Sequence, residues 1–420
     1  MPDRISFKEN VTRPVDDQLR AELLAARVAL KRDLAPRLEQ LVVGETAATL
    51  QNLVGSFRLP RGDVVDVLPK IDVGRDWSEA VVQLLTIDTR ISITGSRRSR
   101  ATPKRNDLTS AIALEYARRL DTALRHAGPI EVYERHHLLS RRPRGHLNVS
   151  KWVRTALLDP TRFPVSVDEL SGANDFSRAL SVVAGQLSRS VPGGELSARL
   201  RRLQSAVIPG QATPSHAPSA VARRALPAQW STYRPAWDLA VALLRNQSII
   251  GDAGRSIGLE VAIEPWPLLE TLLTRALHAL ASDTGMNVVP KTNHPLLRRM
   301  DGSTATRVVP DGALQLNGRT VATFECKYTV PGATPKDGHS HQALATAAAL
   351  GAPVAVLVYP NDEPARSYQV VGFHGHPATL VTVGLSMYSY RRASGDEDRA
   401  TLLKQVLATT AEDRDLDIRL

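Results

Sequence analysis

Residues 307–328 read RVVPDGALQLNGRTVATFECKY, and this stretch decides the fold of the C-terminal part of the chain. Two β-rich runs flank the Asn-Gly pair at 317–318, which is the strongest short-range signal for a β-hairpin. A leucine stripe at helical spacing over residues 265–280 precedes the hairpin, and an Ala-rich helix at 341–350 and a strand at 352–360 follow it. The order helix, strand, strand, helix, strand predicts an α/β domain whose central mixed sheet is flanked by helices.

Two carboxylates and an amine converge at the open end of the predicted hairpin. Asp311 lies at the end of the first strand, and Glu325 and Lys327 lie near the end of the second strand with their side chains on one face. Oxygen ligands in that number suit Mg²⁺, with Mn²⁺ as an alternative. A lysine beside the metal can orient or deprotonate the attacking water, whose pKa the metal lowers. This arrangement predicts Mg²⁺-dependent hydrolysis of phosphodiester bonds.

The hairpin needs one irregularity if the two acids are to share a site. A two-residue loop pairs Leu316 with Arg319. In that register Asp311 lies opposite Phe324, so Asp311 and Glu325 fall on opposite faces of the ladder. We therefore predict a three-residue loop or a β-bulge, because bulges are common beside active centres and would return both acids to one face.

Each of these residues also has a purely structural explanation. Glu325 and Lys327 could form a solvated strand face, Asp311 could be a turn residue, and Glu270 could be an acid favoured by the N-terminal dipole of its helix. The Glu-x-Lys pattern alone is weak. Its combination with the Pro-Asp sequence, the hairpin and the following helix favours the metal site.

The composition is compatible with an anionic partner and indicates a cytoplasmic protein. The 420-residue chain carries a net charge of +10, and basic residues gather at 97–105 and 141–144. The single cysteine, Cys326, excludes an internal disulfide and a cysteine-based zinc site. The charged N-terminus has no apolar signal segment and no long apolar run occurs, so we expect no membrane segment.

At the hairpin the sequence resembles the PD-(D/E)XK nuclease superfamily, and the wider chain resembles McrC-like nuclease subunits of modification-dependent restriction systems. The similarity rests on VVPDG and FECKY and on the stretch that follows them, at 337–360. In the N-terminal half it rests on VLPKID (67–72), PRGHLNVSKWVR (143–154) and DELSGANDFSRALSVVAGQL (168–187), in which Ser177 stands where Asn is usual.

The resemblance implies roles for five residues. Asp311, Glu325 and Glu270 would be the metal ligands, Lys327 would be the catalytic lysine, and Gln342 would belong to the catalytic centre at the position that often carries Gln after the lysine. On this basis we predict a nuclease domain at residues 251–420.

The rest of the chain is expected to serve the complex. We predict an N-terminal α+β region at 1–140 that docks a partner, and a helical middle region at 141–250 with a loop rich in Pro, Ala and Ser at 208–230. The basic stretch at 96–107 is predicted to be an exposed loop. This loop would either enter a partner or hold DNA through its phosphates.

The resemblance implies an endonuclease subunit of a restriction or anti-phage defence complex. It would cut double-stranded DNA with the help of a McrB-like AAA+ GTPase or NTPase that recognises modified DNA and translocates. No G-x-x-x-x-G-K-[ST] loop occurs, so this chain lacks the motor motif. Two alternatives are a catalytically idle nuclease-fold subunit that stimulates the NTPase and a stand-alone repair nuclease; the intact acidic residues and lysine and the long N-terminal half favour the first hypothesis.

Overall fold

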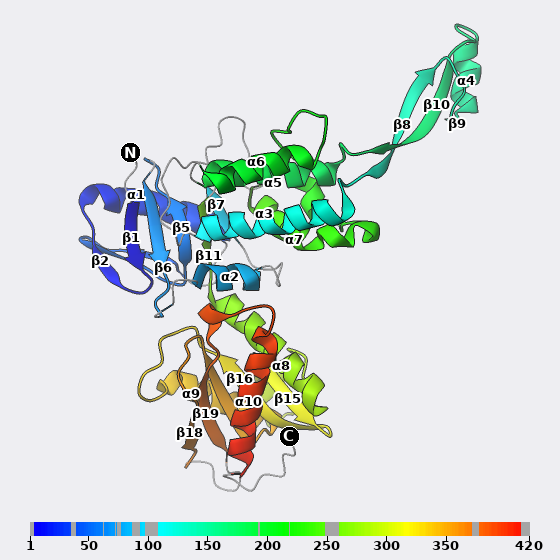
Figure 1. Cartoon of the computed structure of the whole chain (residues 1–420). Coiled ribbons are helices and arrows are strands. Elements are labelled where there is room, and N and C mark those ends of the chain that lie inside the picture. The colour runs from blue at the N-terminus through cyan, green and yellow to red at the C-terminus, as the bar shows by residue number, and fades with distance from the viewer. Residues whose placement is uncertain are drawn as a thin grey trace. The chain divides into compact units, whose positions relative to one another are not determined.

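The computed structural model describes residues 4–34, 39–61, 63–71, 73, 77–85, 93–96, 108–191, 194–217, 219–247, 260–371 and 378–412. The chain has a mixed α/β fold, as predicted (Figure 1). It divides into two compact units: residues 1–96, 103–112 and 260–420 form the first, and residues 97–102 and 113–259 form the second.

The two units cross the boundaries of the three consecutive regions predicted from the sequence. Strand β11 (Glu260–Ile263) is the reason, because it pairs antiparallel with β5 (Val54–Arg58) and β7 (Ile93–Ser96), far away in sequence. The first unit therefore combines the start of the chain with its C-terminal part. The predicted middle region also differs in content, since it contains strands as well as helices.

The N-terminal part of the first unit is built on a five-stranded sheet of order β1-β6-β5-β11-β7. A three-stranded sheet of order β2-β4-β3 and the helices α1 and α2 accompany it. The bounds of these elements are β1 (Arg4–Lys8), β2 (Thr12–Pro14), α1 (Asp17–Leu34), β3 (Leu41–Val43), β4 (Ala47–Leu50), β6 (Val64–Leu68) and α2 (Trp77–Leu85). Buried side chains of α1, such as Leu23, pack with Phe7, Phe57 and Val65 of the large sheet. This part therefore has its own hydrophobic core.

The C-terminal part of the first unit is built on the predicted mixed sheet. Its strand order is β12-β15-β16-β17-β19-β18, with β16, β17 and β19 parallel and the other pairs antiparallel. The strands are β12 (Asn287–Val288), β15 (Gly312–Leu316), β16 (Arg319–Cys326), β17 (Val354–Tyr359), β18 (Arg366–Gln369) and β19 (Thr379–Gly384). A separate hairpin, β13 (His294–Arg298) and β14 (Thr304–Val308), precedes β15.

Helices α8 (Trp266–Thr284), α9 (Asp337–Leu350) and α10 (Gly395–Glu412) cover this sheet (Figure 1). The predicted leucine stripe of α8 is confirmed, since its leucines from Leu268 to Leu280 are buried. Small residues on α9, Ala343 and Ala347, pack in one cluster with Ala355 and Leu357 of β17. Small side chains let the helix axis approach the strands closely, and this brings α9 next to β16.

The predicted irregularity of the hairpin is confirmed as a β-bulge. Leu316 pairs with Arg319 across a turn in which Asn317 and Gly318 both have positive φ, as an Asn-Gly hairpin requires. The register then shifts between Gln315 and Leu314, so that Val321 has no partner. As a result Gly312 pairs with Phe324. Continued by one residue, this register sets Asp311 opposite Glu325, on one face of the hairpin.

The second unit combines a helical body with a projecting arm. Its body contains most of α3 (Leu108–Ala127) together with α5 (Asp175–Ser190), α6 (Glu195–Ala206), α7 (Arg234–Gln247) and the short 3-10 helices η1 (Ser219–Arg223) and η2 (Ala228–Tyr233). The arm is the antiparallel pair β8 (Val132–Ser140) and β10 (Phe163–Ser171), with β9 (His146–Leu147) and α4 (Val149–Ala156) at its end. It extends away from the helices of its unit (Figure 1).

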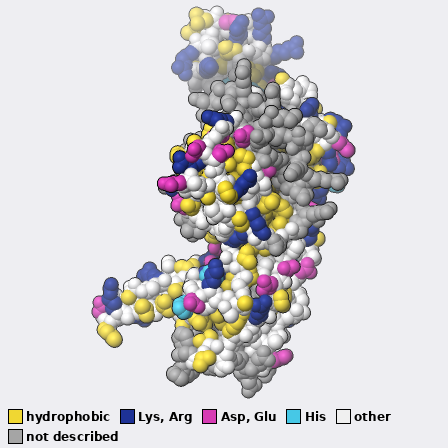
Figure 2. Space-filling model, turned by 90° about the vertical axis from the view of Figure 1, so that its left-hand side faces the viewer, with side chains coloured by type: hydrophobic (Ala, Val, Ile, Leu, Met, Phe, Trp, Pro, Cys, Tyr) yellow, Lys and Arg dark blue, Asp and Glu magenta, His cyan; other side chains and the backbone are white. Residues whose placement is uncertain are grey.

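Within the described ranges no helix has both the length and the apolar character needed to span a bilayer. The face of the molecule in Figure 2 carries Lys and Arg in several groups, with acidic and apolar side chains between them. Basic side chains therefore lie in separate groups on this face.

We predict that Gly312→Ala destabilises the first unit. A Cβ atom at position 312 would lie 2.4 Å from Cδ1 of Leu277, a buried residue of α8, so the helix would have to shift away from the sheet. The expected loss in the free energy of unfolding is about 1–3 kcal/mol, measured by urea denaturation. Gly338→Ala on α9 is the matched control, because open space surrounds its position. Equal stability of both variants would contradict the close approach of α8.

Candidate active site

Asp311 and Glu325 lie at the open end of the β15–β16 hairpin. Asp311 directly precedes β15, and its Oδ2 accepts a 2.8 Å hydrogen bond from the backbone N–H of Cys326. This bond from a side chain joins the two strands just beyond the last ladder pair, that of Gly312 and Phe324. The carboxylate of Asp311 is thereby fixed against the strand that carries Glu325.

Glu325 is almost completely buried, with 2% of its surface exposed. Two side chains of α9 hold its carboxylate: Thr346 Oγ1 donates to Oε1 at 2.9 Å, and Gln342 Nε2 donates to Oε2 at 2.9 Å. Gln342 and Thr346 are four residues apart and therefore lie on one face of the helix. The close packing of α9 on the sheet is what brings both donors to Glu325.

Lys327 completes a short chain of hydrogen bonds. Its Nζ donates to Oε1 of Gln342 at 2.6 Å and lies 3.6 Å from Oε2 of Glu325. The backbone N–H of Lys327 donates to Val358 O, which extends the parallel pairing of β16 with β17. Because Gln342 accepts from the lysine and donates to the glutamate, it orients both groups at once.

Glu270 lies on the first turns of α8, and a lysine that the sequence analysis did not single out holds it. Lys291 Nζ donates to Oε2 of Glu270 at 2.6 Å and lies 3.8 Å from Oδ1 of Asp311. The ammonium group thus lies beside two carboxylates. Lys291 belongs to no recognisable sequence pattern. Thr346 was also not singled out, but its place one helical turn after Gln342 is a signal from which it could have been predicted.

The electrostatics of the site are dominated by buried negative charge. Burial raises the pKa of Asp311, and the charge of Glu270 raises it further. Burial also raises the pKa of Glu325 to about 7, with a second contribution from the charge of Asp311. The nearby lysines and hydrogen-bond donors offset only part of this effect. A divalent cation would therefore be favoured here, because it would offset repulsion between the acids.

The donor atoms fit a hard cation such as Mg²⁺, which binds one or two protein carboxylates. Asp311 and Glu325 supply oxygens on one face of the hairpin, and Glu270 is paired with Lys291. In the part of the chain that the structure describes, no three His, Cys, Asp or Glu side chains already form a metal-ligating group. Two carboxylates are thus the core of the candidate site, and Glu270 would join only after leaving Lys291.

A buried polar cluster in the first unit anchors the residue that follows Lys327. The hydroxyl of Tyr328 donates to Oε2 of Glu9 at 2.9 Å and lies 2.5 Å from the hydroxyl of Tyr388. Lys70, from the VLPKID stretch, lies 3.5 Å from Oε1 of Glu9 and 4.2 Å from the centre of the Tyr328 ring. The N-terminal sheet and the end of β16 are therefore connected by side chains within one unit.

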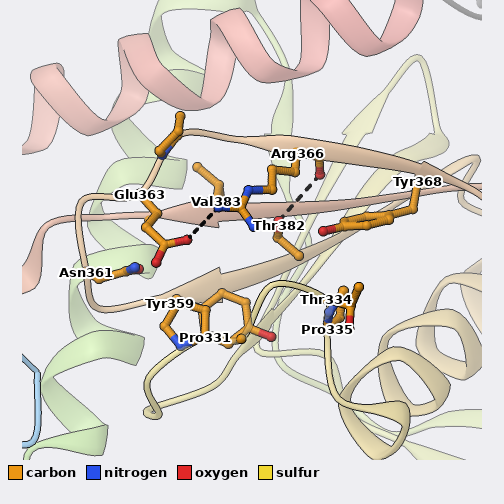
Figure 3. Close-up of a pocket in the computed structure, with 13 residues that line it drawn as sticks. Pro331, Thr334, Pro335, Tyr359, Asn361, Glu363, Arg366, Tyr368, Thr382 and Val383 are labelled. Atoms are coloured by element: carbon orange, nitrogen blue, oxygen red, sulfur yellow. Dashed lines mark hydrogen bonds and ion pairs between the residues drawn. The ribbon is translucent and has the colours of Figure 1, made fainter.

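A separate pocket lies beside the ends of β17 and β19 (Figure 3). Its charged side chains, Arg366 and Glu363, form an ion pair at 3.2 Å. None of the five residues predicted to form the active centre lines it; its walls are made by Pro331, Gly332, Thr334, Pro335, Tyr359, Asn361, Glu363, Pro364, Arg366, Tyr368, Thr382, Val383 and Gly384. We assign it no catalytic role.

The raised pKa of Glu325 predicts a pH dependence of stability. Between its ordinary pKa of 4.5 and the value of about 7 in the fold, the folded protein holds a proton that the unfolded chain has released. Stability is therefore greatest below pH 4.5 with respect to this group and falls as the pH rises through 7. In buffer with a chelator, the free energy of unfolding of the wild type should fall between pH 5 and 8. We expect this fall to be smaller in the Glu325→Gln variant, by up to about 3 kcal/mol. Identical pH profiles in urea denaturation would contradict this assignment.

Comparison with known proteins identifies the family and supports the fold. A family model described as "McrBC 5-methylcytosine restriction system component" matches residues 48–360, which is more than half of the chain. No curated protein matches the sequence. A chain of a solved Thermococcus gammatolerans half-complex of McrB AAA+ hexamers with bound McrC has a TM-score of 0.66 and 15% identity, and the match covers 96% of this chain and 100% of that chain.

A second solved structure, the Thermococcus gammatolerans McrBC complex, contains a chain with a TM-score of 0.47 and 17% identity, matched over 65% of this chain and 88% of that chain. At such identities the likeness to the first structure concerns the fold alone. The family match is independent of it. The chain belongs to the family of McrBC 5-methylcytosine restriction system components.

Proposed function

We propose that this chain is the DNA-cutting subunit of a restriction complex, a PD-(D/E)XK endonuclease that hydrolyses phosphodiester bonds in double-stranded DNA in the cytoplasm. One observation carries the proposal. Asp311 and Glu325 share a face of the bulged hairpin, and Lys327 is connected to Glu325 through Gln342. The family membership agrees with a role in restriction.

In this proposal the acids hold the cation and the lysine acts on water. Asp311 and Glu325 would bind Mg²⁺ or Mn²⁺, with Glu270 as a third ligand. The bound metal would lower the pKa of water and offset negative charge on the phosphate. Lys327 would donate a hydrogen bond that orients the attacking water. Gln342 would keep the lysine and Glu325 at the spacing that the structure gives them.

We further propose that the chain acts with an AAA+ NTPase. The solved relative with the same fold comes from an assembly of McrB AAA+ hexamers with bound McrC. The arm of the second unit offers a docking surface, since α4 has no buried residue and the two leucines after it, Leu157 and Leu158, are 89% and 91% exposed. Such exposed apolar groups mark surfaces that a partner covers.

The loop at 96–107, which the sequence predicts to project, lies outside the described residues except for Ser96. Its role therefore stays a prediction. The arm is a described alternative for the same task, and it joins exposed apolar side chains to basic ones such as Arg142 and Arg154.

Lys327→Ala is expected to reduce the cleavage rate of plasmid DNA by at least a factor of about 100 in Mg²⁺ with the partner NTPase present, because it removes the group that orients water. Thermal unfolding and NTPase stimulation should stay close to those of the wild type. Lys404→Ala is the matched control, since it removes a lysine paired with Asp283 on α8. Cleavage at the wild-type rate by the Lys327 variant would contradict the assignment, and a wild type that only stimulates the NTPase would support the idle alternative.

Replacement of Leu157 and Leu158 by Ser should weaken partner binding by about tenfold or more, because the loss of two large buried contacts at an interface costs at least about 1.4 kcal/mol. The fold should be unaffected, since both side chains are exposed in the free chain. Binding to the NTPase can be measured by interferometry. Val371→Ser is the control, because Val371 is also highly exposed, at 81%, but lies in the first unit. Unchanged affinity of the double variant would remove the arm from the docking surface.

A further inference from the structure

We infer that the β13–β14 hairpin grips the DNA duplex beside the candidate active site, with Arg298, Arg299 and Arg307 against backbone phosphates and Met300 against the bases in a groove. The inference rests on the proposed function as a DNA nuclease. It assigns a substrate-holding role to a segment that the proposed chemistry does not use.

The hairpin is inserted in the chain directly between two charged residues of the site. Lys291, which contacts Glu270 and Asp311, is separated from β13 by two residues, and two residues separate β14 from Asp311. Both strands of the hairpin pack against α9, the helix that carries Gln342. DNA with a phosphate at the acids would therefore lie next to this hairpin.

The tip of the hairpin has a fixed shape. The backbone N–H of Arg299 donates to Ser303 O at 2.7 Å, and that of Gly302 donates to Arg299 O at 2.9 Å. The carboxylate of Asp301 accepts from the backbone N–H of Ser303 at 2.8 Å. Gly302 has a φ of 83°, which a glycine adopts without strain. These bonds hold the turn so that Met300 points outward before any partner binds.

Met300 has no structural reason to be apolar. It is fully exposed, and turn positions of this kind favour small polar residues. Leu297 on the same hairpin is also more than half exposed. Proteins that bind the minor groove often place an apolar side chain such as Met against the base steps, between basic residues that hold the backbone. Here Arg298 and Arg299 directly precede Met300, and Arg307 lies on the paired strand.

The basic side chains of the hairpin are available to bind phosphates. Arg298, Arg299 and Arg307 are exposed, and none forms an ion pair with a residue that the structure describes. The carboxylate of Asp301, at the tip, already accepts a hydrogen bond from the backbone N–H of Ser303 in the turn. The local positive charge favours a nucleic acid over an apolar protein partner.

The length of the hairpin suits a duplex. Strands of five residues extend about 16 Å, at about 3.3 Å per residue. One turn of B-DNA is about 34 Å long, so the tip would reach about half a turn from the phosphate held at the acids. It could then contact the neighbouring groove of the same duplex.

The test is DNA binding by the full chain in Ca²⁺, which replaces Mg²⁺ so that binding is read without cleavage. The probe is a fluorescein-labelled 30-base-pair duplex, and anisotropy is recorded at several salt concentrations. We expect Arg298→Ala/Arg299→Ala to bind about tenfold more weakly at 0.15 M salt and to lower the salt slope by about 2, since each lost phosphate contact removes about 0.9. Met300→Ser should weaken binding about threefold or more, with the slope unchanged, because it removes no charge.

Arg319→Ala/Lys404→Ala is the matched control, since it removes the same charge from the start of β16 and from α10. Wild-type affinity and slope in the Arg298/Arg299 variant, or no duplex binding by the wild type, would overturn the inference. Loss of partner-NTPase binding in that variant, with DNA affinity unchanged, would reassign the hairpin to the protein interface. If the wild type binds the duplex through the hairpin but does not cleave DNA in Mg²⁺, the nuclease function is refuted and the inference about the hairpin stands.

Discussion

The C-terminal part of the first unit depends on one constraint, which is that a buried carboxylate and a partly buried one lie close together. Asp311 and Glu325 repel each other, and burial raises the pKa of both. Hydrogen-bond donors and positive charges around the two carboxylates partly offset this repulsion. They are the backbone N–H of Cys326, the side chains of Gln342 and Thr346, and the ammonium groups of Lys291 and Lys327. Without a cation this arrangement lowers stability, and burial of this kind is more common at functional sites than elsewhere, in agreement with the proposed metal site.

The bulge at Val321 is the local feature that creates this constraint. Without it, the Asn-Gly turn would place the acids on opposite faces, and each could be solvated by itself. With it, Gly312 and Phe324 pair against α8, Glu325 is held by Gln342 and Thr346 of α9, and Asp311 accepts a hydrogen bond from the backbone N–H of Cys326. Hydrophobic packing on one face therefore holds the charged groups in register on the other. A single inserted residue thus separates a structural hairpin from one that can hold a cation.

The sequence pattern predicted those parts of the fold that are formed by residues close together in the chain. The leucine stripe of α8, the hairpin turn and the need for a bulge all follow from periodicity and pairing rules within about 60 residues. The pairing of β11 with β5 joins residues about 200 positions apart, and no periodicity reports such a contact. The two compact units differ from the three consecutive predicted regions for that reason. Lys291 was missed for a similar one, since a lysine in a loop has no signature until its carboxylate partners are placed.

The long-range connection also concerns the candidate site. Tyr328 follows Lys327 directly, and its hydroxyl is held by Glu9, which is itself paired with Lys70 at the end of β6. A buried ion pair adds little net stability, because desolvation offsets the attraction, but it tolerates few alternative geometries. Glu9 keeps a raised pKa for the same reason, since its burial outweighs the charge of Lys70. The cluster therefore fixes where the polypeptide leaves β16, and so it fixes the backbone from which Lys327 reaches Gln342. The N-terminal sheet is in this sense part of the support of the centre.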